Sequence, residues 1–148
     1  ENTFKGKLFQ AAYEKYSTQI DVSIQPGYGL VELVEQGKQD SRTARELLAG
    51  YLQPMIEKGV DTLVLGCTHY PFLEPSIRAI AGTRLTLIDP APAVARQVSR
   101  VLNSSDLACH KDHHPEYRFY TTGQSGVTEQ FVTSIMEKPY TVEQVVTG

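Results

Sequence analysis

The apolar and polar positions alternate between short runs typical of β-strands and longer stretches with helical spacing. Four short runs, each bounded by Gly, Pro or Asp, predict strands at Gln19–Ile24, Thr62–Leu65, Arg84–Ile88 and Tyr117–Thr122. The stretches between them predict helices at Lys7–Tyr16, Leu30–Gln36, about Thr43–Lys58, Pro71–Ala79, Ala93–Leu102 and Val127–Met136. This alternation is typical of βαβ units, so we predict an α/β protein with a largely parallel sheet flanked by helices.

The longest predicted helix carries the strongest local signals. Thr43 with Glu46 resembles a capping box at its start, and Gly59 suits the cap at its end. Later in the chain, the turn Pro90-Ala91-Pro92 interrupts the alternation and predicts a domain boundary near Asp89. We therefore expect one α/β domain in residues 1–89. Residues 90–148 are a small unit to stabilise alone, and we expect them to complete a domain whose N-terminal part is absent from this sequence.

Composition excludes several classes of function. With 41% apolar residues and 21% charged residues, the chain is typical of a soluble globular protein, and its net charge of −3 gives no electrostatic case for binding nucleic acid or anionic lipid. Its longest apolar runs are too short for a membrane span, and it shows no secretory signal. We expect a cytoplasmic protein whose two cysteines, Cys67 and Cys109, are free thiols. Because the sequence opens with Glu1 rather than Met, we also expect a piece of a longer protein.

Three chemically active side chains follow the second predicted strand. Gly66 ends the strand, and Cys67, Thr68 and His69 come next, before Pro71. Ligand crevices in open α/β sheets lie at this end of the strands. If Pro71 begins a helix, its N-terminus favours a thiolate at Cys67 and offers N–H groups to a substrate carboxylate. A lone cysteine after an apolar strand is usually a small buried residue, but this combination of thiol, hydroxyl and imidazole favours a reactive site.

The same stretch resembles a family signature. Residues 65–73 spell L-G-C-T-H-Y-P-F-L and are similar to the second-cysteine signature of glutamate racemases, L-G-C-T-H-[YF]-P-[LF]-L. Residues 30–35 resemble the family's L-V-P-L-V-E, with Glu32 in place of Pro. Residues 87–90 resemble its L-I-D-S, with Pro90 in place of Ser. The resemblance spans nearly the whole chain, and only the cysteine signature is sharply diagnostic.

The resemblance implies a specific chemistry and a set of site residues. Glutamate racemases use no cofactor and no metal, and exchange the Cα proton of glutamate between two cysteines on opposite faces of the substrate. By position, Cys67 would be one of these acid–base residues, Thr68 would bind the substrate's head group, and His69 would assist Cys67 or contact the substrate. Thr3 lies where the family has a second substrate-side threonine, and Glu35 would be a nearby acid. The expected role is supply of D-glutamate for peptidoglycan precursors, with the substrate between two similar α/β domains and a homodimer possible.

One part of the family's pattern is missing from this sequence. The first catalytic cysteine of the family lies in a C-N-T motif, after a D-S-G segment, and neither occurs here. Cys109 is no substitute, because no Asn-Thr follows it and no apolar strand precedes it. We therefore expect that this polypeptide alone does not racemise glutamate.

Other readings of these residues stay open. An aspartate racemase of the same superfamily usually carries Glu after Gly-Cys-Thr, so His69 favours glutamate. A hydrolase with Cys67 as nucleophile and His69 as base is a second alternative, and a non-catalytic binding or dimerisation module is a third. The run Cys109–His114 matches no standard zinc spacing, so we expect a solvated loop. The turn Gly123–Gly126 lacks the known phosphate-binding patterns.

Overall fold

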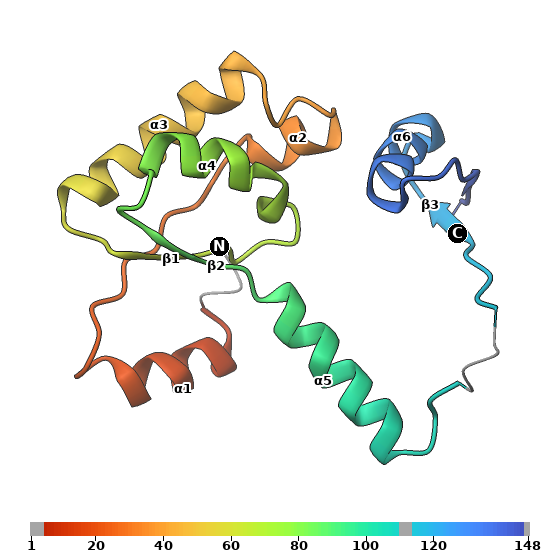
Figure 1. Cartoon of the computed structure of the whole chain (residues 1–148), viewed down its shortest axis with the longest axis horizontal. Coiled ribbons are helices and arrows are strands. Elements are labelled where there is room, and N and C mark those ends of the chain that lie inside the picture. Colours follow the sequence, from red (N-terminus) through yellow and green to blue (C-terminus); the bar gives the residue numbers. More distant parts are fainter. Residues whose placement is uncertain (1–4, 110–113, 147–148) are drawn as a thin grey trace.

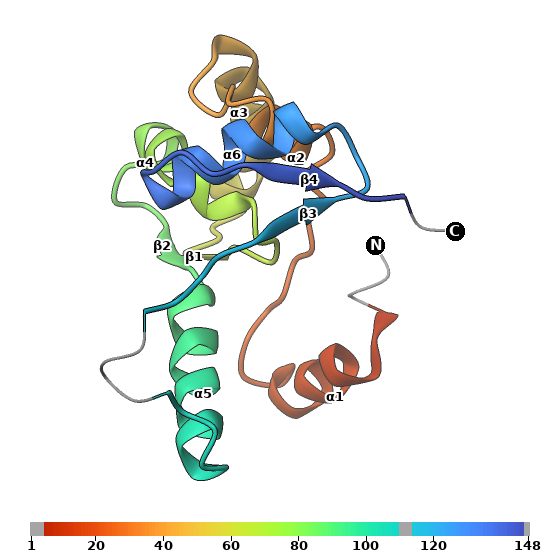
Figure 2. The same cartoon turned by 90° about the vertical axis from the view of Figure 1, so that its right-hand side faces the viewer.

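The computed structural model describes residues 5–109 and 114–146 and contains two small parallel sheets with helices around them (Figures 1 and 2). Strand β1 (Thr62–Val64) pairs in parallel with β2 (Thr86–Ile88), so that Leu63 lies opposite Leu87. Strand β3 (Phe119–Thr121) pairs in parallel with β4 (Val142–Gln144). The predicted α/β class, with parallel sheet flanked by helices, is confirmed.

Helices α2 (Leu30–Glu35), α3 (Arg42–Glu57) and α4 (Glu74–Ala81) gather on one side of the β1–β2 sheet (Figure 1). Their apolar faces meet the sheet because leucine and other aliphatic residues recur on one side of each helix. The resulting core consists of Leu30, Val34, Leu48, Leu52, Leu65, Leu73, Ile77, Ala81 and Leu85. This core fixes the position of β1 and therefore of the segment that follows it.

The start of α3 differs from the sequence prediction. Ser41 is the cap, and its Oγ accepts a hydrogen bond from the Ala44 N–H at 3.2 Å. Ser41 has the extended backbone that a cap requires, with ψ of 160°, whereas Thr43 is already inside the helix. The predicted capping box at Thr43 is therefore wrong. Gly59, just beyond the helix, has a φ of 81°, as its predicted role at the helix end requires.

The second sheet is built around α6 (Ser125–Met136), which connects β3 to β4 and packs against both. Val132 of α6 and Val142 of β4 are buried, so this unit has a small apolar centre of its own. The sequence pattern did not predict β4. Helix α6 also contacts α2, which places it beside the first sheet's helices.

Two helices bury little of their surface in the described chain. Helix α5 (Ala91–Ser104) contains no buried residue, and its apolar Val94 and Val98 are 60% and 52% exposed. It extends away from β2 and leads to the second sheet, while α1 (Lys7–Tyr16) lies below the first sheet (Figure 1). None of the helices in residues 5–109 and 114–146 has the length and apolar composition of a membrane span.

The strand predicted at Gln19–Ile24 is absent. Residues 20–27 adopt no regular structure, and Ile20 and Ile24 are exposed. An alternating apolar run needs a neighbouring strand to form ladder hydrogen bonds, and this run pairs with none of the described strands.

Candidate functional site

The Gly-Cys-Thr-His segment lies at the C-terminal end of β1. The strand's hydrogen bonding continues one residue further, because the Leu65 N–H donates to the Ile88 carbonyl at 3.0 Å. Leu65 is buried in the core and Gly66 is exposed, so the chain leaves the interior at this point. Cys67 is half-buried rather than sealed among apolar residues. Its thiol is therefore placed where the end of a parallel strand meets solvent.

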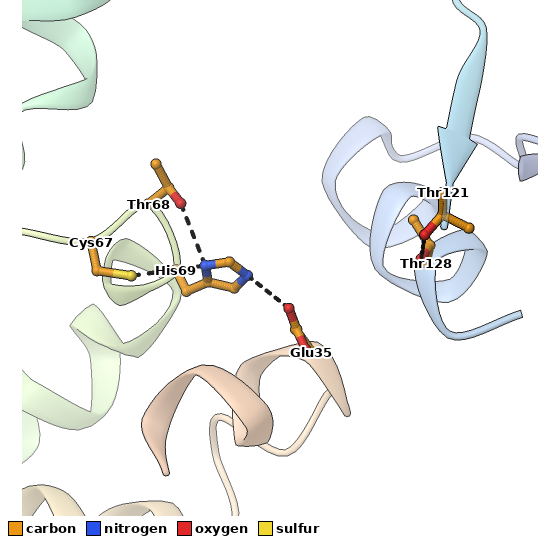
Figure 3. Close-up of polar contacts among 6 residues, drawn as sticks. All are labelled: Glu35, Cys67, Thr68, His69, Thr121 and Thr128. Carbon is orange, nitrogen blue, oxygen red and sulfur yellow. Dashed lines mark hydrogen bonds and ion pairs between the residues drawn. The ribbon is translucent and has the colours of Figure 1, made fainter. Parts of the chain in front are cut away.

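His69 is the centre of the polar contacts at the site (Figure 3). Its Nδ1 lies 3.9 Å from the Cys67 Sγ and 3.4 Å from the Thr68 Oγ1. On the other side of the ring, its Nε2 lies 3.4 Å from Oε1 of Glu35, which ends α2. The structure thus brings Cys67, Thr68 and His69 together as the sequence predicted. It also places the Glu35 carboxylate in direct contact with the imidazole.

These distances favour one arrangement of protons on the imidazole. The carboxylate of Glu35 can only accept a hydrogen bond, so Nε2 carries the proton that faces it. In the neutral ring Nδ1 is then an acceptor, and it faces the thiol and the hydroxyl. A base beside a thiol can take its proton and generate the nucleophilic or basic thiolate. The arrangement is chemically suited to moving a proton at the sulfur of Cys67.

The helix expected to begin at Pro71 takes a different form. Residues Tyr70–Leu73 form a short 3-10 helix, η2, and α4 begins only at Glu74. The Tyr70 N–H donates to the Cys67 carbonyl at 3.1 Å, and the Phe72 N–H donates to the His69 carbonyl at 3.2 Å. These two N–H groups are therefore already bonded within the chain. A four-residue helix also has few aligned peptide dipoles. The stabilisation of a thiolate at Cys67 by a helix dipole is therefore much smaller than the sequence predicted.

Two aromatic residues complete the surroundings of His69, and neither was predicted as a site residue. The ring of Phe131, from α6, stacks on the imidazole with centroids 5.7 Å apart and an interplanar angle of 14°. Phe72, from η2, meets Phe131 edge-on at 5.3 Å. No periodicity or motif marks Phe131 as a site residue. Only the packing of α6 beside α2 brings it there.

Tyr70 connects the motif to the segment before α2. Its hydroxyl donates to the Gly27 carbonyl at 3.4 Å. Burial, with a smaller contribution from nearby Cys67, raises the pKa of the Tyr70 phenol above its ordinary value, because both disfavour the phenolate. Tyr70 therefore acts as a neutral hydrogen-bond donor at neutral pH.

A cavity of about 240 Å³ lies between α2, η2 and α6, next to the His69 contacts. Glu35, Phe72 and Phe131 line it together with Gln39. The Gln39 Oε1 is buried and has no hydrogen-bond partner among the described residues. Within the same described ranges, no three His, Cys, Asp or Glu side chains are grouped as metal ligands would be.

Some predicted residues cannot be placed at the site. Thr3 lies outside the described residues, and its role stays a prediction. Residues 110–113 of the His-rich run also lie outside them. Cys109 is a free, exposed thiol beyond the end of α5.

The Asp/Glu/Hydantoin racemase family matches residues 1–98, more than half of the chain. The chain belongs to this family. Its resemblance to racemases, first seen in residues 65–73, is thereby confirmed. The match includes β1, the Gly-Cys-Thr-His segment and Glu35, and it ends within α5.

Relatives of this racemase-family chain are similar in sequence and in structure. A curated glutamate racemase of Ralstonia nicotianae is 52% identical over 107 residues, covering 72% of this chain and 39% of the relative. A curated glutamate racemase of Cupriavidus pinatubonensis is 41% identical over 135 residues, covering 91% of this chain and 50% of that relative. The solved glutamate racemase of Bacillus anthracis matches with a TM-score of 0.81 and 27% identity, covering 97% of this chain and 54% of that one.

A glutamate racemase of Francisella tularensis, solved in complex with D-glutamate, matches with a TM-score of 0.77 and 26% identity, covering 93% of this chain and 52% of that one. This racemase-family chain therefore spans about half the length of the relatives it matches.

Proposed function

We propose that this chain is one part of a glutamate racemase and that it supplies one of the two acid–base thiols, Cys67. The observation that carries the proposal is the series of contacts from Cys67 through His69 to Glu35 at the end of β1. The family membership and the curated relatives named as glutamate racemases support the same reaction.

The contacts support a defined sequence of proton movements. The His69 Nδ1 accepts the thiol proton, and the Glu35 carboxylate stabilises the charge that develops on the ring. The Cys67 thiolate then takes the Cα proton of glutamate: the C–H bond breaks, an S–H bond forms, and the electron pair stays on the substrate. Inversion requires an acid on the opposite face of Cα, and a second thiol from outside this sequence would supply that proton. No cofactor is needed for this exchange.

Thr68 is the proposed contact for the amino-acid head group of the substrate. It is exposed, and its hydroxyl lies beside the imidazole rather than in the core. Thr3 is proposed as a second contact of the same kind. Glutamate is the proposed substrate because His69, rather than Glu, follows Gly-Cys-Thr.

The proposed organisation has residues 1–89 as one α/β domain and residues 90–148 as the C-terminal part of its partner domain. The exposed valines of α5 support this division, because an amphipathic helix with no buried residue is stable only when another element covers its apolar face. Exposed tyrosines such as Tyr13 and Tyr16 support a possible homodimer contact. The proposed role is cytoplasmic supply of D-glutamate for peptidoglycan precursors.

The test compares this chain alone with the same chain joined to the N-terminal half of the Ralstonia nicotianae relative. D-glutamate formation and deuterium incorporation at Cα are measured in D₂O. We expect no turnover from the chain alone, turnover from the joined protein, loss of turnover in Cys67→Ser and little change in the control Cys109→Ser. Turnover by the chain alone that Cys67→Ser abolishes would contradict the two-thiol division. A joined protein whose turnover survives Cys67→Ser would overturn the role of Cys67.

A Cys-His hydrolase is the second candidate, because Cys67, His69 and Glu35 are also in the order of a nucleophile, a base and an orienting acid. A hydrolase forms an acyl-thioester on Cys67, which mass spectrometry of the trapped protein detects. A racemase exchanges protons without any such adduct. An aspartate racemase would instead show Cα exchange with aspartate in preference to glutamate, and a binding module would bind glutamate without exchange.

A further inference from the structure

The imidazole of His69 is held by contacts from two distant parts of the chain. Its ring nitrogens lie 3.9 Å from the Cys67 Sγ and 3.4 Å from the Glu35 Oε1. The Thr68 Oγ1 also lies 3.4 Å from Nδ1, so all of these polar contacts are made to the ring nitrogens. None of these contacts packs against a face of the ring, so a contact on a ring face restrains the orientation of the imidazole further.

Phe131 supplies that contact. Its ring lies nearly parallel to the imidazole, at 14° and 5.7 Å, within the range of favourable aromatic pairs. We propose that Phe131 is a positioning residue that sets the plane of the His69 ring and so keeps Nδ1 directed at the Cys67 thiol. This inference rests on the proposed role of Cys67 and His69 in proton transfer.

Phe131 is itself held firmly enough to perform this role. Phe72 packs edge-on against it at 5.3 Å, and its side chain packs against the buried core of the first sheet. Helix α6 is tied to β3 by a hydrogen bond from the Thr128 hydroxyl to the Thr121 hydroxyl at 3.3 Å (Figure 3). Residues that position a reactive group are most effective when packing fixes their own rotamers and they lie on regular elements.

The geometry also assigns the C-terminal segment a direct part in the site. Glu35, Cys67 and His69 all belong to the first sheet and its helices, whereas Phe131 belongs to the second unit. The side chain of His69 is only 24% exposed, partly because Phe131 covers one face of its ring. Docking of α6 is therefore coupled to the orientation of the imidazole.

The first measurement uses the unmodified chain and NMR. With the ring centroids 5.7 Å apart, we expect nuclear Overhauser contacts between the two rings and a ring-current shift of the His69 ring protons that is lost in Phe131→Leu. Absence of these contacts in the folded protein would overturn the proposal without any variant. This measurement is independent of whether the protein racemises glutamate.

The second measurement is the alkylation rate of Cys67 relative to Cys109, with iodoacetamide as the probe and the exposed Cys109 as internal reference. We expect Phe131→Leu to lower this ratio roughly two- to ten-fold, the range that corresponds to loss of one aromatic pair. Phe131→Tyr, which keeps the ring, should restore the ratio.

The matched control is Phe119→Leu. Phe119 lies in the same segment and packs edge-on against Tyr140 at 5.2 Å, away from His69. An equal fall in Phe119→Leu, or an unchanged ratio and unchanged His69 shifts in folded Phe131→Leu, would overturn the proposal. Failure of the joined enzyme to form D-glutamate would instead contradict the proposed function and leave this result standing.

Discussion

The contact between Gly27 and Tyr70 offers a quantitative test of how the motif is held in place. A Cβ added at residue 27 would lie 2.6 Å from the Tyr70 Oη and 2.8 Å from the Leu30 Cδ1. Both distances are shorter than real Cβ contacts, so Gly27→Ala must displace at least one of these side chains. Leu30 is buried in the core and Tyr70 packs against that core, so neither side chain can move without disturbing packing.

The expected cost follows from the two effects involved. Inserting one methyl group into a packed site costs about 1–3 kcal/mol. Displacing Tyr70 also lengthens its 3.4 Å hydrogen bond to the Gly27 carbonyl. Such a bond contributes about 0.5–1.5 kcal/mol. We therefore predict that Gly27→Ala lowers the free energy of unfolding by about 1.5–4.5 kcal/mol. Tyr70→Phe removes the closest atom but leaves the ring carbon Cζ at 3.1 Å and the Leu30 contact, so the double variant should recover only about 1 kcal/mol of this loss.

Urea unfolding, followed by circular dichroism, measures all four members of this cycle. Gly50→Ala is the matched control, because Gly50 lies inside α3 with nothing within 4 Å of its added Cβ. It should raise the free energy of unfolding by roughly 0.5–1 kcal/mol through helix propensity. An unchanged urea midpoint in Gly27→Ala, or additive effects of Gly27→Ala and Tyr70→Phe in the double variant, would refute this prediction.

Three further predictions concern the cap of α3, the buried core and the phenol of Tyr70. Ser41→Ala should lower the free energy of unfolding by about 1 kcal/mol, because α3 loses its cap. Thr43→Ala should leave the free energy of unfolding nearly unchanged, and equal effects of the two variants in urea unfolding would contradict the assignment of Ser41 as the cap. Leu73 is 1% exposed, so Leu73→Ala should lower the free energy of unfolding by about 2–5 kcal/mol. Leu107→Ala, at an exposed side chain, should lower it by less than about 0.5 kcal/mol, and similar urea midpoints for the two variants would refute this prediction. Because the pKa of Tyr70 is raised in the folded state, its contribution to stability is full below about pH 10 and is lost as the pH rises through the folded-state pKa. From about pH 9 to pH 11 the wild type should therefore lose more free energy of unfolding than Tyr70→Phe. Parallel losses in the two proteins would contradict this prediction.

The sequence predicted the elements that local patterns determine. Helix α1 matches its prediction at both ends, and α3 was found from its apolar stripe. The placement of Cys67, Thr68 and His69 at a strand end followed from an apolar run, a glycine and a proline in order. Each of these inferences depends only on neighbouring residues, which is why they agree with the structure.

The missed features depend on residues far apart in the chain. Strand β4 is defined by pairing with β3 rather than by its own composition. Conversely, Gln19–Ile24 has the composition of a strand but pairs with no described strand. Phe131 reaches His69 only through tertiary packing, so no local pattern could assign it. The start of the helix after the motif was misjudged because Pro71 is equally compatible with a 3-10 turn.

The order in which the neighbours of His69 occur along the chain bears on how the protein matures during synthesis. A ribosome releases the chain from its N-terminus, so Glu35 emerges before the histidine and Phe131 emerges long after it. The nascent imidazole can therefore meet its carboxylate first, and it gains its aromatic cover only when α6 has been made and docked. A truncation that removes α6 would leave the thiol and the imidazole in the polypeptide, but it would strip away the ring that covers the histidine.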